Sequence, residues 1–429
     1  MRTPNKIKKS LVASFWDGIF SACSSGLITD YVTPYALVLK ATIRQIGFLS
    51  AIPFLASSIV QLVSADIAEK LKSRKKAIVI FVFAHTLMFV PIMLIPYLFA
   101  SQAVLFLIVF MTLYTGFNTL VSPIWSGLMT EYIPTRKRGS YFGWRNKIVS
   151  IVVIVASLSA GLILQHFRNE PLRGFLIILI LAFAARLISW YFLTRMYEPR
   201  FIVDKSAYFS IIDFIKNIRH SNFARFVLFV SGMQFCVNLA SPFFSVFMLK
   251  DLKFNYLTYT AIVTVVTATQ IFTIGRWGRC ADRIGNLKVL KFTAVIIAGL
   301  PLWWIINRHP AYLLVAQVVS GFAWSGFNLC TGNFVYDATT PAKRIRCFGY
   351  LSVFVGLAIC FGGILGGHLA HVVPAIFGYK LLSLFFISSI LRFLVVFFLA
   401  RTIKEVRPVE TMHTGDIVLS IVGLKRIRQ

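Results

Sequence analysis

Long apolar runs, separated by short polar stretches, recur along the whole chain. A helix that crosses the hydrocarbon core of a bilayer needs about 20 mostly apolar residues. Twelve segments reach that length, and we predict a membrane helix in each. They are residues 13–39, 47–65, 77–97, 103–129, 140–165, 174–197, 223–249, 256–275, 289–307, 311–336, 347–370 and 380–400. The pattern therefore predicts an all-α transmembrane fold with twelve helices.

The composition agrees with a chain that uses lipid as its solvent. Hydrophobic residues make up 58% of the 429 residues, and charged residues only 14%. A soluble domain carries about 25% charged residues. The sequence also contains no HExxH, GxxxxGK[ST] or GxSxG motif. We therefore predict that the protein is not an enzyme, uses no cofactor and holds no metal, and that a solute or ion gradient supplies its energy.

The basic residues are distributed unevenly between the two sets of predicted loops. If the N-terminus lies inside, 34 of the 44 Lys and Arg residues fall on the inner side and two, Arg186 and Arg392, fall within helices. The outer loops hold the other eight, Lys40, Arg44, Arg168, Arg173, Lys250, Lys253, Arg308 and Lys380. An inner excess of this kind sets membrane orientation. We predict that both termini are cytoplasmic, and the formal charge of +29 then requires no nucleic acid partner.

The chain divides into two sets of six predicted helices. We assign residues 1–197 to an N-terminal bundle, 223–401 to a C-terminal bundle and 402–429 to a cytoplasmic tail. The linker, 198–222, has an amphipathic pattern that predicts a short interfacial helix. A shift of 206 residues pairs Glu131 with Asp337, Arg138 with Arg344, and Arg186 with Arg392. Parallel six-helix repeats imply a solute site between them and alternating access.

Two motifs carry a resemblance to a known family. Gly278, Asp282, Arg283, Gly285 and Lys288 stand in the pattern G-x3-D-R-x-G-x2-K after the eighth helix. This pattern resembles motif A of the major facilitator superfamily. The loops from Glu131 to Gly143 and from Asp337 to Gly349 resemble the acidic and basic pair of that superfamily, and the resemblance covers nearly the whole chain.

The resemblance implies a conformational latch of charged residues at the inner helix ends. The candidates are Asp66, Arg74, Glu131, Arg138, Gly278, Asp282, Arg283, Asp337 and Arg344. Asp66 and Arg74 belong to a degraded copy of the motif, in which Leu62 replaces the glycine. The alternative is that these are solvated loop charges that contribute little.

By the same resemblance, helices one, four, seven and ten line a central cavity. Their polar residues are the cavity or ion-coupling candidates, namely Asp30, Asn118, Trp125, Gln234, Asn238, Trp324, Asn328 and Asn333. An ionisable side chain at membrane depth usually faces a cavity. Asp30 is accordingly our candidate carrier of a proton or another cation, and the alternative is an aspartate that reaches the outer surface. For Asp17 we expect no such role, for Arg145 contact with lipid headgroups, and for His85, His368 and His371 isolated positions.

The function that the resemblance implies is secondary active or facilitative transport of a small solute, with proton coupling left open. We expect the chain to be an integral multi-pass protein of the bacterial inner membrane or of an organelle derived from it, surrounded by the lipid bilayer. One alternative is a receptor or scaffold of the same fold that has lost transport. A minor alternative for the substrate, which no residue of the sequence supports specifically, is iron or another metal ion, carried by a facilitator-type protein of a bacterial magnetosome membrane. The sequence identifies neither the solute nor any protein partner.

Overall fold

The fold is almost entirely helical in the part of the chain that is described. The computed structural model describes residues 3–63, 67, 70–199, 221–339 and 344–406. Its α-helices are α1 (Thr3–Ile28), α2 (Val32–Val38), α3 (Ile43–Leu62), α5 (Arg74–Leu87), α6 (Phe89–Leu98), α7 (Ala103–Tyr132), α8 (Thr135–His166), α9 (Pro171–Thr194), α11 (Asn222–Asn238), α12 (Ser241–Val246), α13 (Tyr256–Ile284), α14 (Asn286–Ile306), α15 (Pro310–Ala338), α16 (Arg344–Val372) and α17 (Lys380–Leu399). Short 3₁₀ or π segments are η1 (Thr29–Tyr31), η2 (Ala100–Gln102), η3 (Phe247–Asp251) and η4 (Ala400–Thr402).

Twelve helical stretches in these residues are long and apolar enough to cross a bilayer, which confirms the predicted fold class. Some spans combine two helices, as α1 and α2 do through η1. A large boundary difference concerns the eighth span, predicted to end at residue 275. In the structure α13 continues to Ile284, so Gly278, Asp282 and Arg283 lie on its last turns and not in a loop. The predicted interfacial helix in the linker lies outside the described residues.

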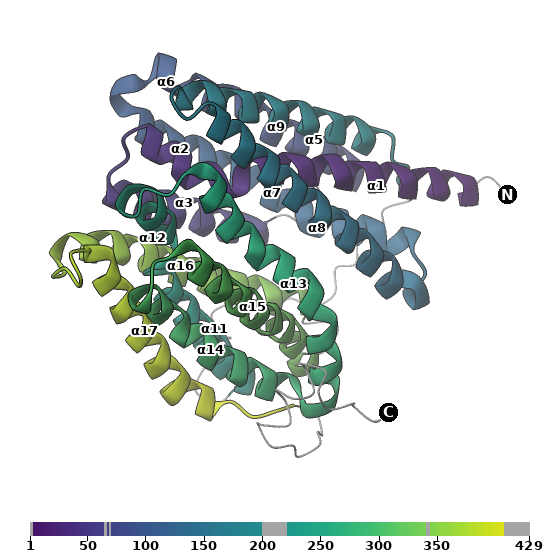
Figure 1. Cartoon of the computed structure of the whole chain (residues 1–429). Helices are drawn as coiled ribbons and strands as arrows, with labels where there is room; N and C mark the ends of the chain where they lie inside the picture. The colour runs from purple at the N-terminus through teal and green to yellow at the C-terminus, as the bar shows by residue number, and fades with distance from the viewer. Residues whose placement is uncertain (1–2, 64–66, 68–69, 200–220, 340–343, 407–429) are drawn as a thin grey trace. The chain divides into compact units, whose positions relative to one another are not determined.

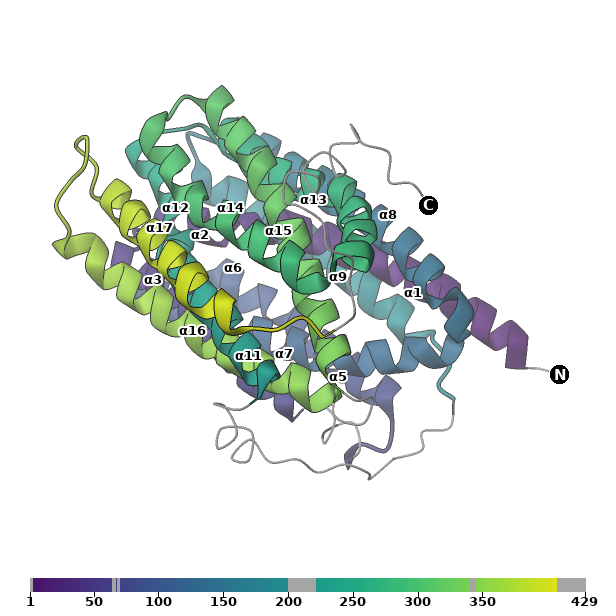
Figure 2. The same ribbon diagram turned by 90° about the horizontal axis from the view of Figure 1, so that it is seen from below.

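The chain forms two compact units. Unit 1 comprises Met1–Lys205, Pro242–Thr264 and Gly363–His368, and unit 2 comprises Ser206–Ser241, Val265–Gly362 and Leu369–Gln429. In unit 1, α1 packs along α8 and α9, while α7 packs against α3 and α5 (Figure 1). In unit 2, α14 lies beside α15 and α17 (Figure 2). The predicted bundle boundaries remain a prediction.

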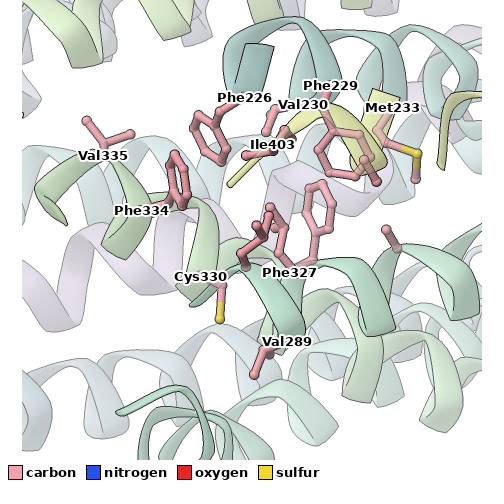
Figure 3. Close-up of a cluster of buried hydrophobic side chains, with 14 of the residues drawn as sticks. Phe226, Phe229, Val230, Met233, Val289, Phe327, Cys330, Phe334, Val335 and Ile403 are labelled. Carbon is pink, nitrogen blue, oxygen red and sulfur yellow. The ribbon is translucent and has the colours of Figure 1, made fainter. Parts of the chain in front are cut away.

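The core of unit 2 is rich in aromatic side chains. Phe226 of α11 and Phe334 of α15 stack with their ring centroids 4.3 Å apart, and Phe327 and Cys330 lie beside them, fully buried (Figure 3). Lipid tails are as apolar as these side chains, so close packing supplies more of the helix association than burial from water does.

Prolines free backbone carbonyl groups that distant side chains then satisfy. A proline in a helix removes the hydrogen bond to the carbonyl four residues earlier. Pro34 thus frees the carbonyl of Asp30, where the helix narrows to η1, and Pro301 frees that of Ile297. The Tyr259 hydroxyl donates to Asp30 O at 2.6 Å, and Arg392 Nη1 donates to Ile297 O at 3.0 Å. Such substitutes are needed because hydrocarbon offers no water.

Candidate functional site

A network of charged side chains is buried between the helices of unit 1. Asp17 of α1, Arg145 of α8 and Arg186 of α9 are only 5–8% exposed. Arg186 Nη1 donates to Ser189 Oγ at 3.1 Å, and Ser189 Oγ donates to Asp17 Oδ1 at 2.7 Å. Arg145 Nη2 lies 3.9 Å from Asp17 Oδ2. One carboxylate therefore stands between two guanidinium groups.

The other donors of Arg186 are taken by neutral groups. Nε donates to His85 Nδ1 at 3.1 Å, Nη1 to Ser21 Oγ at 2.6 Å, and Nη2 to Asn118 Oδ1 at 3.3 Å. Since His85 accepts at Nδ1, it is not doubly protonated in this arrangement. The network consequently carries one negative and two positive charges. A buried excess positive charge is costly, so this network is a candidate functional site.

Arg145 also contacts groups outside its pair with Asp17. Its Nη2 donates to Ser14 O at 3.2 Å, and its Cζ lies 4.6 Å from the centre of the Trp125 ring. A side chain at Gly18 would collide with the guanidinium group, so the glycine gives Arg145 its place across α1. Within the described residues, Arg145 Nε, Trp125 Nε1 and Ser14 Oγ are buried without a hydrogen-bond partner. The expectation that Arg145 meets lipid headgroups is wrong, because the side chain is buried.

The predicted cavity residues fall into separate places. Asn118 and Trp125 both touch the network just described. Gln234 and Asn238 are one turn apart on α11, where Asn238 Nδ2 donates to Gln234 O at 2.9 Å. Trp324, Asn328 and Asn333 all lie on α15. Trp324 packs edge-on against Phe327, with 5.6 Å between the ring centroids, while Asn328 is exposed and Asn333 is half-buried. Sequence patterns did not connect Asp17, Arg145, Arg186 and Ser189 in one network. The available signal was the presence of charged residues within apolar helices.

Asp30 lies in a second polar cluster, also within unit 1. Its Oδ2 accepts from Ser157 Oγ at 2.9 Å, and its backbone carbonyl accepts from the Tyr259 hydroxyl. Next to it, the Tyr31 hydroxyl donates to Ser157 O at 2.6 Å and lies 2.7 Å from Thr260 Oγ1. We refer to Asp30, Tyr31, Ser157, Tyr259 and Thr260 as the Asp30 cluster. It ties η1 and α8 to the first turn of α13.

At the predicted inner end of unit 1, acidic residues hold the start of α5. Arg74, the first residue of α5, forms an ion pair with Glu131 near the end of α7. Glu198 accepts from Ser73 Oγ at 2.5 Å and from Arg74 N at 2.6 Å, at the positive end of the helix. Arg138, another latch candidate, donates to the backbone carbonyls of Thr130 and Ile133.

Unit 2 contains the corresponding arrangement at the start of α14. Asn286, the first residue of α14, donates through Nδ2 to Asp337 Oδ2 at 2.7 Å near the end of α15. Glu405 Oε2 accepts from Leu287 N at 2.7 Å. In each half, two acidic residues thus contact the start of the third membrane helix, which is α5 or α14. One lies near the end of the fourth membrane helix, α7 or α15, and the other follows the sixth, α9 or α17. The structure therefore repeats the contact as well as the sequence pattern.

The remaining latch candidates are only partly described. Asp282 is exposed and has no hydrogen bond or ion pair among the described residues, whereas Arg283 and Asp337 have further interactions. Gly278 lies on α13 beside Leu329. Asp66 lies outside the described residues, as does the side chain of Arg344. A latch function for these residues stays a prediction.

No group of three or more His, Cys, Asp and Glu residues in the described part of the chain could hold a metal ion. His85 is hydrogen-bonded to Arg186, and His368 and His371 are exposed on α16.

Known proteins resemble the chain at three levels. The family model described as Major Facilitator Superfamily matches residues 13–244 and 226–428. The tetracycline resistance protein, class B, of Escherichia coli is 29% identical over 156 residues, which is 35% of this chain and 36% of that protein's length.

Solved structures with similar folds include three transporters. A nucleoside transporter gives a TM-score of 0.72 at 15% identity, covering 92% of this chain and all of the other. A D-xylose–proton symporter gives 0.72 at 14%, covering 94% and 98%. A bacterial homologue of the iron transporter ferroportin gives 0.67 at 11%, covering 94% and 99%. At these identities the structures show a shared fold, and the family model shows the relationship. The chain belongs to the Major Facilitator Superfamily and is a multi-pass membrane protein.

Proposed function

We propose that the protein is a secondary transporter that carries a small solute by alternating access, and that the Asp30 cluster closes one end of the path. The observation that carries this proposal is the pair of contacts from the start of α13, Tyr259 to Asp30 and Thr260 to Tyr31, each joining residues 229 positions apart. These contacts tie a segment of the second half of the sequence to the first helix and α8.

The contacts in the Asp30 cluster have the strength that a reversible closure requires. A hydrogen bond contributes about 0.5–1.5 kcal/mol net, so two or three of them hold a state that a bound solute can release. A solute that binds the open state more tightly shifts the population by that difference in affinity. The absence of a P-loop motif from the sequence leaves a gradient as the energy source.

Asp30 is also placed to sense an ion. Its carboxylate accepts from Ser157 and belongs to the cluster that must separate. A proton bound there would change the charge of the closure itself. We therefore propose Asp30 as the coupling group, if transport is coupled.

Transport assays in proteoliposomes test this function. We expect saturable uptake or counterflow of at least one solute from a panel of sugars, nucleosides, organic acids, organic cations and iron. Each solute is measured with a pH gradient, a sodium gradient and no gradient, against protein-free vesicles. If correctly folded protein moves none of them, transport in this form is contradicted and a receptor or scaffold is the better description.

A further inference from the structure

A cavity of about 620 Å³ lies in unit 1, at the end that the charge distribution predicts to be outer. Three segments surround it: the residues after α2, the end of α8 with the turn that follows, and the stretch from η3 to the start of α13. The residues that matter here are Lys40, Gln165, Arg168, Lys250, Asn255 and Phe254.

Three cationic side chains line this cavity, one from each of the three segments. Lys40, Arg168 and Lys250 are exposed, and none forms an ion pair with a described residue. Only two carboxylates belong to the predicted outer loops. Glu170 is held by Arg173, with Nη1 and Oε2 2.6 Å apart. Asp251 interacts electrostatically with Lys250 but forms no ion pair with it and does not line the cavity, so the lining itself holds three cations and no carboxylate. The cavity therefore has a positive potential.

This concentration of charge is unfavourable in the empty protein. Like charges around one cavity repel each other, and basic residues in short outer loops work against the charge bias that orients the helices. Three separate segments nevertheless each supply one cation to the same space. An anion in the cavity would reverse the sign of the interaction.

Neutral polar groups and apolar side chains complete the lining of the cavity. Gln165 Oε1 is buried and has no hydrogen-bond partner among the described residues. Asn255 Oδ1 accepts from Thr258 N at 2.8 Å, which leaves its amide nitrogen available to a ligand. Leu37, Val38 and Phe254 give the cavity an apolar side. The lining thus suits a charged head on an apolar body.

We propose that this cavity binds a small organic anion, with a carboxylate or phosphate group against Lys40, Arg168 and Lys250 and an apolar portion against Phe254. The binding site stands independently of transport. That its ligand is the transported solute rests on the proposed function. A positive vestibule also raises the local concentration of an anion and its rate of entry.

Equilibrium binding to the purified full-length protein tests the site. In a neutral detergent we would titrate benzoate and phenyl phosphate, with benzamide as the uncharged control. Both anions should bind and benzamide should bind at least about tenfold more weakly, and raising the salt concentration should weaken anion binding because exposed charges are screened. Binding that ignores charge and salt, or no binding of either anion, overturns the proposal.

A matched pair of variants locates the binding. Arg168→Gln/Lys250→Gln should weaken anion binding about tenfold, from the loss of two partly solvated charge pairs. Arg44→Gln/Lys253→Gln removes the same charge from exposed residues that do not line the cavity, and should change affinity less than twofold. Equal losses in both double variants would overturn the site. Thermal melting without ligand shows whether each variant is folded.

Two further experiments are needed. One distinguishes a lipid headgroup from a soluble anion as the ligand, and the other distinguishes the binding site from the transport function. Nanodiscs of phosphatidylcholine and of phosphatidylglycerol test a lipid headgroup, and stabilisation by phosphatidylglycerol alone, with no soluble anion bound, overturns the solute assignment. Uptake of labelled benzoate is then measured in phosphatidylcholine vesicles. Binding that depends on Arg168 and Lys250 without any uptake supports the site and counts against benzoate as cargo. Uptake that the double variant leaves unchanged refutes the assignment of this site's ligand as the transported solute and keeps the transport function.

Discussion

The hydroxyl of Tyr259 donates a hydrogen bond of 2.6 Å to the backbone carbonyl of Asp30. That carbonyl is available because Pro34, four residues later, has no amide hydrogen to give it. The helix break in the first span therefore provides the acceptor of this contact, and a tyrosine in the eighth span provides the donor. Its loss leaves a carbonyl without a partner at membrane depth.

Replacing Tyr259 with phenylalanine should favour the open state of the Asp30 cluster. The lost bond is worth about 0.5–1.5 kcal/mol, or roughly two- to tenfold in population. Hydrogen–deuterium exchange of the peptide over residues 256–264 should accelerate by that factor. Tyr97→Phe, at an exposed tyrosine, is the control and should leave the peptide's exchange unchanged. Equal exchange in Tyr259→Phe and wild type would remove the hydrogen bond from the closure.

Asp30→Asn separates coupling from movement. Asparagine keeps a side-chain oxygen that accepts from Ser157 but cannot carry an exchangeable charge. We expect net uphill uptake driven by a pH gradient to be lost and counterflow of the same solute to remain. Ser157→Ala, which removes the donor and keeps the carboxylate, should retain uphill uptake. Persistent uphill uptake in Asp30→Asn would place the coupling group elsewhere or indicate a uniporter.

Asp17→Asn should destabilise the protein strongly. It leaves Arg145 and Arg186 buried without a carboxylate, and breaking a buried pair typically costs about 3–5 kcal/mol. The expected result is a large fall in thermal stability and in folded yield. Asp282→Asn makes the same chemical change at an exposed site and should melt as wild type does. Equal melting temperatures for both variants would mean that Asp17 does not balance the arginines.

The apolar pattern predicted the twelve spans because length and hydropathy alone define them. It ended the eighth helix too early, since Arg276, Arg279 and Asp282 stop the apolar run while the backbone stays helical up to Gly285, at φ 95°. It also did not reveal the Asp17 network. Asp17 and Arg186 are 169 residues apart, and hydropathy does not show which faces of their helices meet.

The candidate site was predictable where chemistry and position coincided. Asp30, Asn118 and Trp125 were selected as polar groups in helices one and four, and the structure places each in a polar cluster. Arg145 was misjudged because its place near a helix start suggested headgroups. Its burial depends on Gly18, which leaves space on another helix.

Alternating access requires the contacts that hold the proposed closed end of unit 1 to separate during transport. On α3 and α16, Ser50 and Gly363 meet closely, and a Cβ atom at Gly363 would lie 2.9 Å from Ser50 Oγ. Cysteine side chains at both positions would therefore meet, and we expect them to form a disulfide on oxidation. The link would fix these two helices while leaving the Asp30 cluster and the charged network unchanged.

The most direct measurement is solute counterflow by Ser50→Cys/Gly363→Cys before and after oxidation. We expect counterflow to stop when the disulfide forms and to return when dithiothreitol reduces it, while each single cysteine variant is insensitive to both treatments. Mass spectrometry reports the fraction linked. Full counterflow in fully linked protein would show that this end need not open, and would contradict alternating access through the Asp30 cluster.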